Sequence, residues 1–263
     1  MISSSRSKYP IHLLGNSEHC QQLTYYSADS MIPLQDANQA RSFPFFNWFI
    51  LILNVLFFLF EISMSEGELN AFIEANGFVP VRFAHDFGLG EIMTIFSSMF
   101  MHAGWMHLIS NMWALHIFGD NVEDKMGHGN YVIFYIICGV AAALTDFLVH
   151  PGSGTPTIGA SGALAGVLGA YLVLFPAAKI ITLIPIIIIP YFVELPAIVF
   201  LGFWFLSQFF TGLGSLDNSP VAAEASVAWW AHIGGFIAGM ILVKLFEKRE
   251  EYNRYYQDEY YPW

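Results

Sequence analysis

The chain has 263 residues, of which 56% are hydrophobic and only 12% are charged, whereas a soluble domain normally carries about twice that share of charge. This composition predicts an integral, multi-pass membrane protein. The formal net charge of −11 argues against a nucleic-acid partner, because there is no basic stripe to neutralise phosphates. The two cysteines, Cys20 and Cys138, are too few for a disulfide framework.

The N-terminal residues 1–43 are polar and show no periodicity that predicts an element. We expect a cytoplasmic segment, either a flexible tail or a small adaptor. It contains no long apolar core, so we expect no cleaved signal peptide, and the first span must direct insertion. Residues 44–246 are predicted to form the membrane domain, and the charged, Tyr-rich residues 247–263 a cytoplasmic tail.

Within the membrane domain, a span needs about 20 apolar residues. Two apolar runs, 92–119 and 180–211, are too long for one straight helix, since the first would reach about 42 Å. A break near Ala103–Gly104 divides the first run and leaves 92–102 as an interfacial helix. Pro185, Pro190 and Pro196 interrupt the second run, so we expect 180–193 to be an interfacial or re-entrant piece. The six predicted spans are 45–64, 104–119, 131–149, 158–175, 195–211 and 227–246.

Six spans place both termini on the same side of the membrane, and the Lys/Arg distribution predicts which side that is. With the termini inside, Arg82 is the one basic residue outside. The basic residues inside are then Arg6, Lys8, Arg41, Lys125, Lys179, Lys244, Lys248, Arg249 and Arg254. We therefore expect both termini to be cytoplasmic.

This topology brings four polar side chains to one depth. His107 and Asn111 lie near the start of the second span, Ser161 near the start of the fourth and His232 near the start of the sixth. All four are expected roughly 5–10 Å below the outer face. Each alone has a simpler explanation, because a serine among Gly and Ala, a lone His or a lone Asn commonly serves helix packing. Because all four are expected at one depth, they favour a shared functional site over four separate packing roles.

The chemistry that these groups can perform is acyl transfer. A serine hydroxyl needs a neighbouring base to take its proton, and His232 is the candidate base for Ser161. His107, the Asn111 amide and backbone N–H groups at the start of the fourth span can donate to an oxyanion. No Asp or Glu lies at a matching depth to orient His232, so we predict a Ser–His dyad without a third member.

Small residues spaced four apart agree with this arrangement. Gly162 and Gly166 lie in the fourth span, and Gly235 and Gly239 lie in the sixth. Such faces let two helix backbones approach closely, which would bring the serine and the histidine into hydrogen-bond reach.

These residues resemble the rhomboid family of intramembrane serine proteases. The resemblance covers about residues 44–246 and rests on three motifs in order: HxxxN at 107–111, GxSG at 159–162 and AHxxG at 231–235. It implies an all-α, six-transmembrane-helix rhomboid-like bundle that cuts transmembrane helices of other proteins without a cofactor or metal. The phrases FMHAGWMHLISN, FGDNVEDKMG and WWAHIGGFIAG are similar to those of prokaryotic members, which implies a bacterial or archaeal cell (inner) membrane.

The resemblance also implies residue roles. Ser161 would be the nucleophile and His232 the general base, with His107, Asn111 and the Ser161 N–H forming the oxyanion hole. Gly159 would let the backbone approach the site. Two further roles concern other parts of the chain: Glu123 would tie a cytoplasmic turn together, and the bulky Phe203, Trp204 and Phe205 would plug a lateral substrate entrance beside the fifth span.

Two other function classes stay open. One is a catalytically silent rhomboid-like factor that binds membrane proteins, although such proteins typically lose the serine or histidine. The other is a metal or proton transporter, suggested by the histidines His85, His102, His107, His116 and His128, but without an HExxH motif or a carboxylate partner in the core. The expected partners are the lipid bilayer and transmembrane protein substrates, and the oligomeric state is left open.

Overall fold

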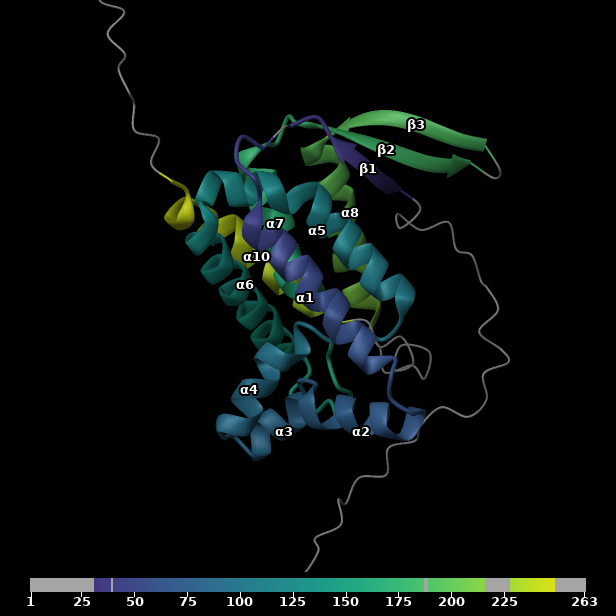
Figure 1. The fold of residues 1–263 in the computed structure, drawn as a ribbon, viewed down its shortest axis with the longest axis vertical. Helices are drawn as coiled ribbons and strands as arrows, with labels where there is room; N and C mark the ends of the chain where they lie inside the picture. The colour runs from purple at the N-terminus through teal and green to yellow at the C-terminus, as the bar shows by residue number, and fades with distance from the viewer. Residues whose placement is uncertain (1–30, 39, 187–188, 216–227, 249–263) are drawn as a thin grey trace, which may run out of the picture.

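The computed structural model describes residues 31–38, 40–186, 189–215 and 228–248. The expectations for Cys20, for residues 1–30 and for the Tyr-rich tail lie outside these residues. In the described residues, six helices form a bundle: α1 (Phe45–Glu61), α5 (Trp105–Met126), α6 (His128–Val149), α7 (Ser161–Leu174), α8 (Ala197–Ser215) and α10 (Trp229–Phe246). Figure 1 shows them running roughly parallel to one another.

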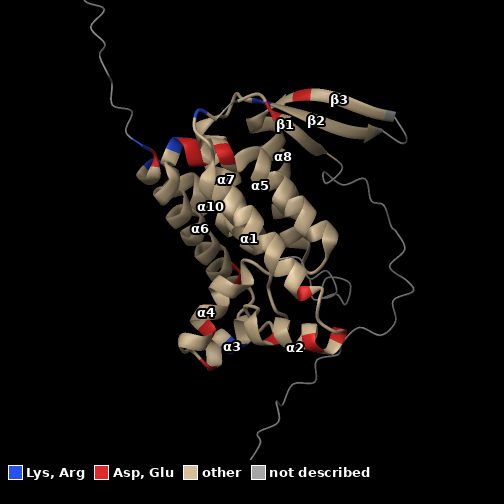
Figure 2. Ribbon diagram, viewed as in Figure 1, with Lys and Arg blue, Asp and Glu red and all other residues tan. Residues whose placement is uncertain are grey.

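The predicted helical membrane bundle is confirmed. Helices α6, α8 and α10 are each long and apolar enough to cross a membrane, and α1 and α7 are shorter apolar helices. Charged residues gather toward the two ends of the bundle in Figure 2, with an almost uncharged band between them. This distribution is the one that a bilayer core requires, because an unpaired charge there is costly.

One end of the bundle carries three further helices, α2 (Glu66–Asn76), α3 (Pro80–His85) and α4 (Leu89–Ser98). We call it the loop end. Helix α4 stops at Ser98 and α5 starts at Trp105, so the break expected near Ala103–Gly104 is confirmed. The helix predicted at 92–102 corresponds to α4, which begins three residues earlier and ends four residues earlier than predicted.

The opposite end carries an antiparallel sheet with the order β1–β2–β3, and we call it the sheet end. Its strands are β1 (Ile32–Asp36), β2 (Lys179–Ile186) and β3 (Ile189–Pro196). The sequence analysis did not predict these strands. The Ile-rich β2 suits a strand. Two of the prolines that we took as interruptions of a helix face each other in the hairpin as Pro185↔Pro190.

Strand β1 is held against α5 and α7 by a buried carboxylate. Asp36 accepts hydrogen bonds from the Tyr171 hydroxyl at 2.6 Å and from the Asn121 amide at 2.9 Å. Burial raises the pKa of Asp36 to about 6, although its hydrogen bond with Tyr171 opposes that shift. Trp113 adds a bond from its indole N–H to the Pro33 carbonyl oxygen at 2.6 Å.

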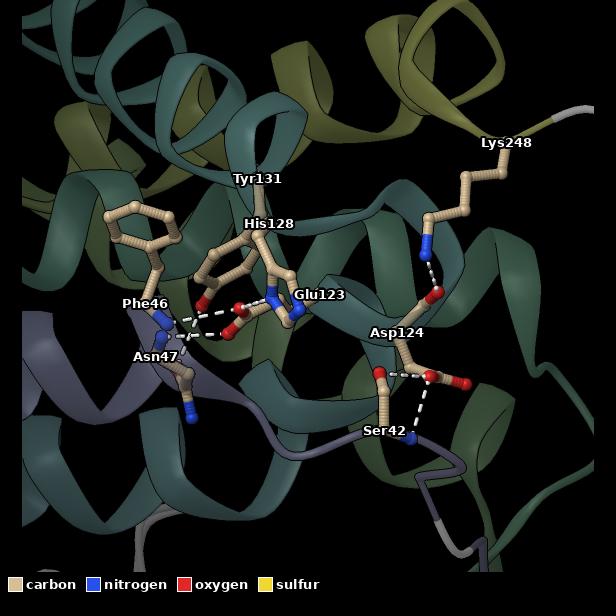
Figure 3. A network of polar contacts seen from close by, with 8 residues as sticks. All are labelled: Ser42, Phe46, Asn47, Glu123, Asp124, His128, Tyr131 and Lys248. Carbon is tan, nitrogen blue, oxygen red and sulfur yellow. Dashed lines mark hydrogen bonds and ion pairs between the residues drawn. The ribbon is translucent and has the colours of Figure 1, made fainter.

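A second network at the sheet end joins the start of α1 to the end of α5 (Figure 3). The buried carboxylate of Glu123 accepts the backbone N–H groups of Phe46 and Asn47 at 3.0 and 2.7 Å, and it also contacts the His128 ring. These two N–H groups belong to the first turn of α1, where no intrahelical acceptor exists. Glu123 therefore caps α1 from another helix.

Helix α7 lies at the centre of the bundle and packs tightly on α10. A side-chain carbon added at Gly235 or Gly239 would collide with the carbonyl oxygen of Gly162 or Gly166, respectively. Gly235 and Gly239 of α10 thus pack directly on the α7 backbone, whereas Cβ atoms added at Gly162 and Gly166 would collide with Ala142 and Cys138 of α6. Because small residues let helix backbones come this close, the glycines of α10 determine how near α7 and α10, and the side chains at their loop-end tips, can lie.

Candidate active site

The backbone leading into α7 turns sharply at Gly159 and presents Ser161 as the first residue of the helix. Gly159 has a φ of +131°, and a Cβ at this position would lie 2.8 Å from the His107 ring. Both the positive φ and the closeness of the His107 ring disfavour a residue with a side chain at this position. The turn is held by a hydrogen bond from the Gly159 N–H to the Ser98 carbonyl oxygen at 2.9 Å.

The serine and histidine lie in hydrogen-bond contact at the loop end of the bundle. Ser161 Oγ is 2.8 Å from His232 Nε2. His232 is the fourth residue of α10, and its ring packs beside Trp204 and edge-on to Trp229, with centroids 6.1 Å away in both cases. A serine oxygen this close to an imidazole nitrogen is arranged for proton transfer.

His107 lies on the other side of the serine, next to the Gly159 turn. The Ala103 N–H donates to His107 Nδ1 at 3.4 Å, so this nitrogen is the acceptor and the ring proton resides on Nε2. The same Nε2 lies against the turn, since a Cβ at Gly159 would be 2.8 Å from it. A neutral His107 can therefore donate a hydrogen bond beside Ser161.

Asn111 is buried one turn further along α5 than His107. Its side-chain amide contacts His102, which lies in the loop before α5. The amide nitrogen lies 3.2 Å from His102 Nε2. The backbone N–H of His102 donates to the buried Glu61 carboxylate at 3.1 Å. The contact of Asn111 with His102 thus supports the loop between α4 and α5.

The sequence analysis missed Gln208 on α8. Its side-chain oxygen lies 2.7 Å from His232 Nδ1, although we expected no residue to orient the histidine. A side-chain amide oxygen can accept the same hydrogen bond from a histidine ring as a carboxylate does. The available signal was a single glutamine within the apolar run FLGFWFLSQFF, because uncompensated polar groups in spans are rare.

The aromatic residues expected beside the fifth span have different environments. Phe203 is 54% exposed on the outside of the bundle. Trp204 and Phe205 turn inward onto Phe236, with ring centroids 5.8 and 4.9 Å apart. Trp204 and Phe205 therefore fill the space between α8 and α10 beside His232.

The histidines that suggested a transporter do not form one cluster, although the rings of His102 and His107 pack edge-on with centroids 5.1 Å apart. In the parts of the chain that the structure describes, no three His, Cys, Asp or Glu side chains come together to hold a metal ion. His116 packs against Trp48 with ring centroids 5.4 Å apart, and His128 contacts Glu123 at the sheet end.

Comparison with known proteins places the chain in a family. The model of the rhomboid domain matches residues 89–249. The chain is 30% identical over 182 residues to RHOMBOID-like protein 5 of Arabidopsis thaliana, covering 66% of this chain and 50% of that protein. It is 26% identical over 195 residues to the chloroplastic Rhomboid-like protein 11 of the same plant, covering 74% and 66%.

A bacterial relative carries protease in its name. The chain is 29% identical over 199 residues to the rhomboid protease GluP of Bacillus subtilis (strain 168), covering 74% of this chain and 34% of that protein. The chain therefore spans between about a third and two thirds of the length of these relatives.

Proposed function

The chain belongs to the rhomboid family, and from this premise we propose that it is an intramembrane serine endopeptidase. Its substrates are transmembrane segments of other membrane proteins, cut in or next to the membrane by a dyad of Ser161 and His232. The observation that carries the proposal is the 2.8 Å contact between Ser161 Oγ and His232 Nε2 inside a helical membrane bundle.

The geometry supports the following sequence of steps. Ser161 Oγ attacks the carbonyl carbon of the scissile bond while His232 Nε2 takes its proton. The resulting oxyanion is stabilised by the Ser161 N–H, which has no intrahelical acceptor at the start of α7, and by the His107 Nε2–H. His232 then gives the proton to the leaving amine, and water hydrolyses the acyl-enzyme by the same steps in reverse.

The distribution of basic residues supports one orientation of the protein in the membrane. Among the described residues, Arg82 is the basic residue at the loop end, whereas five basic residues lie at or near the sheet end: Arg41, Lys125, Lys179, Lys244 and Lys248. The positive-inside rule then makes the sheet end cytoplasmic. Under this proposal the protein resides in a bacterial or archaeal cell membrane with both termini cytoplasmic, and cleavage occurs toward the outer face.

The direct test is cleavage of single-span substrates co-reconstituted with the purified protein in liposomes. The parent protein should cut a substrate with small, helix-weakening residues near its outer end. Ser161→Ala and His232→Ala should each abolish cleavage, while Ser153→Ala, a serine in the loop before α7, should not. If Ser161→Ala cuts as fast as the parent, the mechanism is wrong.

A further inference from the structure

Gln208 is a buried polar side chain on the largely apolar helix α8. Helix α8 exposes large apolar side chains along its length: Ile198, Val199, Phe203, Leu206, Phe210 and Leu213. Gln208 is 3% exposed on the opposite face. Burying an amide in a membrane bundle is costly unless its polar atoms are satisfied, and both polar atoms of Gln208 have partners.

Those partners fix which way the amide points. The Ser207 hydroxyl donates its proton to the Trp204 carbonyl oxygen at 2.7 Å, so Ser207 Oγ is left as an acceptor. The Gln208 Nε2 donates to that oxygen at 3.1 Å. The Gln208 carbonyl oxygen must then face His232, where it lies 2.7 Å from Nδ1.

The direction of the remaining bonds follows from this orientation. A carbonyl oxygen can only accept, so His232 Nδ1 carries the ring proton. His232 Nε2 then presents its lone pair to the Ser161 hydroxyl, 2.8 Å away. This is the tautomer that a general base requires, because the proton of the nucleophile must move to Nε2.

We propose that Gln208 is a positioning residue that holds His232 in the tautomer and orientation needed to accept the Ser161 proton. The inference rests on the proposed protease function and deepens it. A fourth helix, α8, thereby contributes to a site otherwise built from α5, α7 and α10. The amide oxygen fills the place that a carboxylate occupies in a Ser–His–Asp triad, without adding a charge inside the membrane.

Two substitutions separate this role from packing. Gln208→Glu keeps an acceptor oxygen in place, whereas Gln208→Met keeps the length and apolar volume but removes the acceptor. If Gln208 only fills space, Met is the milder change, because a buried carboxyl is harder to accommodate. If it positions His232, Glu is the milder change. Thr211→Val is the matched control, since the exposed Thr211 hydroxyl bonds only to its own helix at Ser207 O, 2.8 Å away.

The first readout is steady-state cleavage of a transmembrane substrate in liposomes. We expect Gln208→Met to lower kcat about 10- to 100-fold, by analogy with metal-bound histidines that lose their orienting partner, with KM changed less than about twofold. Gln208→Glu should keep kcat within about threefold of the parent, and Thr211→Val should match the parent. Equal losses in the Glu and Met variants, or parent kcat in the Met variant, would overturn the proposal.

The second readout does not depend on proteolysis. In protein labelled with ¹⁵N-histidine, the His232 signal, identified by its loss in His232→Asn, should report protonation at Nδ1 in the parent and in Gln208→Glu. Gln208→Met should shift it toward a mixture of tautomers. An unchanged Nδ1-protonated signal in Gln208→Met contradicts the inference even if no substrate is cut, whereas a protein that shows these shifts but cuts nothing contradicts only the proposed function.

Discussion

At the scale of single residues, Gly159 shows how one backbone conformation sets the site. Its positive φ and its closeness to the His107 ring are both specific to a residue without a Cβ. The turn decides how far the first N–H groups of α7 lie from His107, and therefore where an oxyanion could be bound.

We predict that Gly159→Ala lowers the cleavage rate at least about 100-fold. The reason is that moving the Ser161 N–H or the His107 Nε2–H by about 1 Å has an effect of that size. The backbone strain should also destabilise the fold by about 1–3 kcal/mol. Gly154→Ala is the matched control, since a Cβ there meets nothing within 4 Å in the same loop. A Gly159→Ala protein that cuts at the parent rate would show that the turn has no part in the chemistry.

The sequence predicts those residues of the candidate site that lie at one depth in the membrane. Ser161, His107 and His232 are predicted by their shared depth, and the structure brings their side chains together at the loop end. The contact of Asn111 with His102 could not be predicted, because it depends on how the loop between α4 and α5 folds back. Gln208 was missed because helix rotation, which sequence does not give for an apolar helix, decides that it faces inward.

At the scale of elements, hydropathy and helix length predict the spans well because a bilayer fixes both. The sheet was missed because strands depend on partners that are distant in the chain. Strand β1 pairs with β2 across about 150 residues, as in Ile32↔Leu183, and its own segment has no helical or alternating pattern. The apolar run of β2 and β3 resembles a span in composition, and only its pairing makes it a hairpin.

The cap of α1 by Glu123 gives a prediction at this scale. Glu123→Gln replaces a charged acceptor of two N–H groups at a helix N-terminus, where negative charge is favourable. We expect a loss of about 2–4 kcal/mol in the free energy of unfolding, since hydrogen bonds to charged groups contribute about 1.5–3 kcal/mol each. Thermal unfolding in detergent micelles should show the lower midpoint.

The neighbouring Asp124→Asn supplies the control for that change. The half-buried Asp124 accepts two bonds from Ser42, from its N–H at 3.0 Å and its hydroxyl at 2.5 Å, and Figure 3 shows it apart from the Glu123 cluster. Asp124→Asn should lower the free energy of unfolding clearly less than Glu123→Gln does, because solvent can replace the hydrogen bonds that Asp124 loses. Equal unfolding midpoints for Glu123→Gln and the parent would contradict the assigned cap.

At the scale of the whole molecule, the bundle brings four helices to one candidate site. The glycines of α10 that pack on the α7 backbone set the distance between Ser161 and His232, α5 supplies His107, and α8 supplies Gln208. The sheet and the Glu123 network stabilise the opposite end of the bundle. Under the proposed orientation, the candidate site lies toward the outer face of the membrane and the structural networks lie toward the cytoplasm.

The most direct test of the central claim is covalent labelling with a fluorophosphonate, which reacts with serines activated by a base. Mass spectrometry of the labelled parent protein should find the adduct on Ser161. Ser161→Ala should carry no adduct, and His232→Ala should react at least about 100-fold more slowly, in line with the contribution of a general base. A parent protein that is not labelled, or an adduct on another residue, would contradict the account and favour a catalytically silent membrane-protein binding factor.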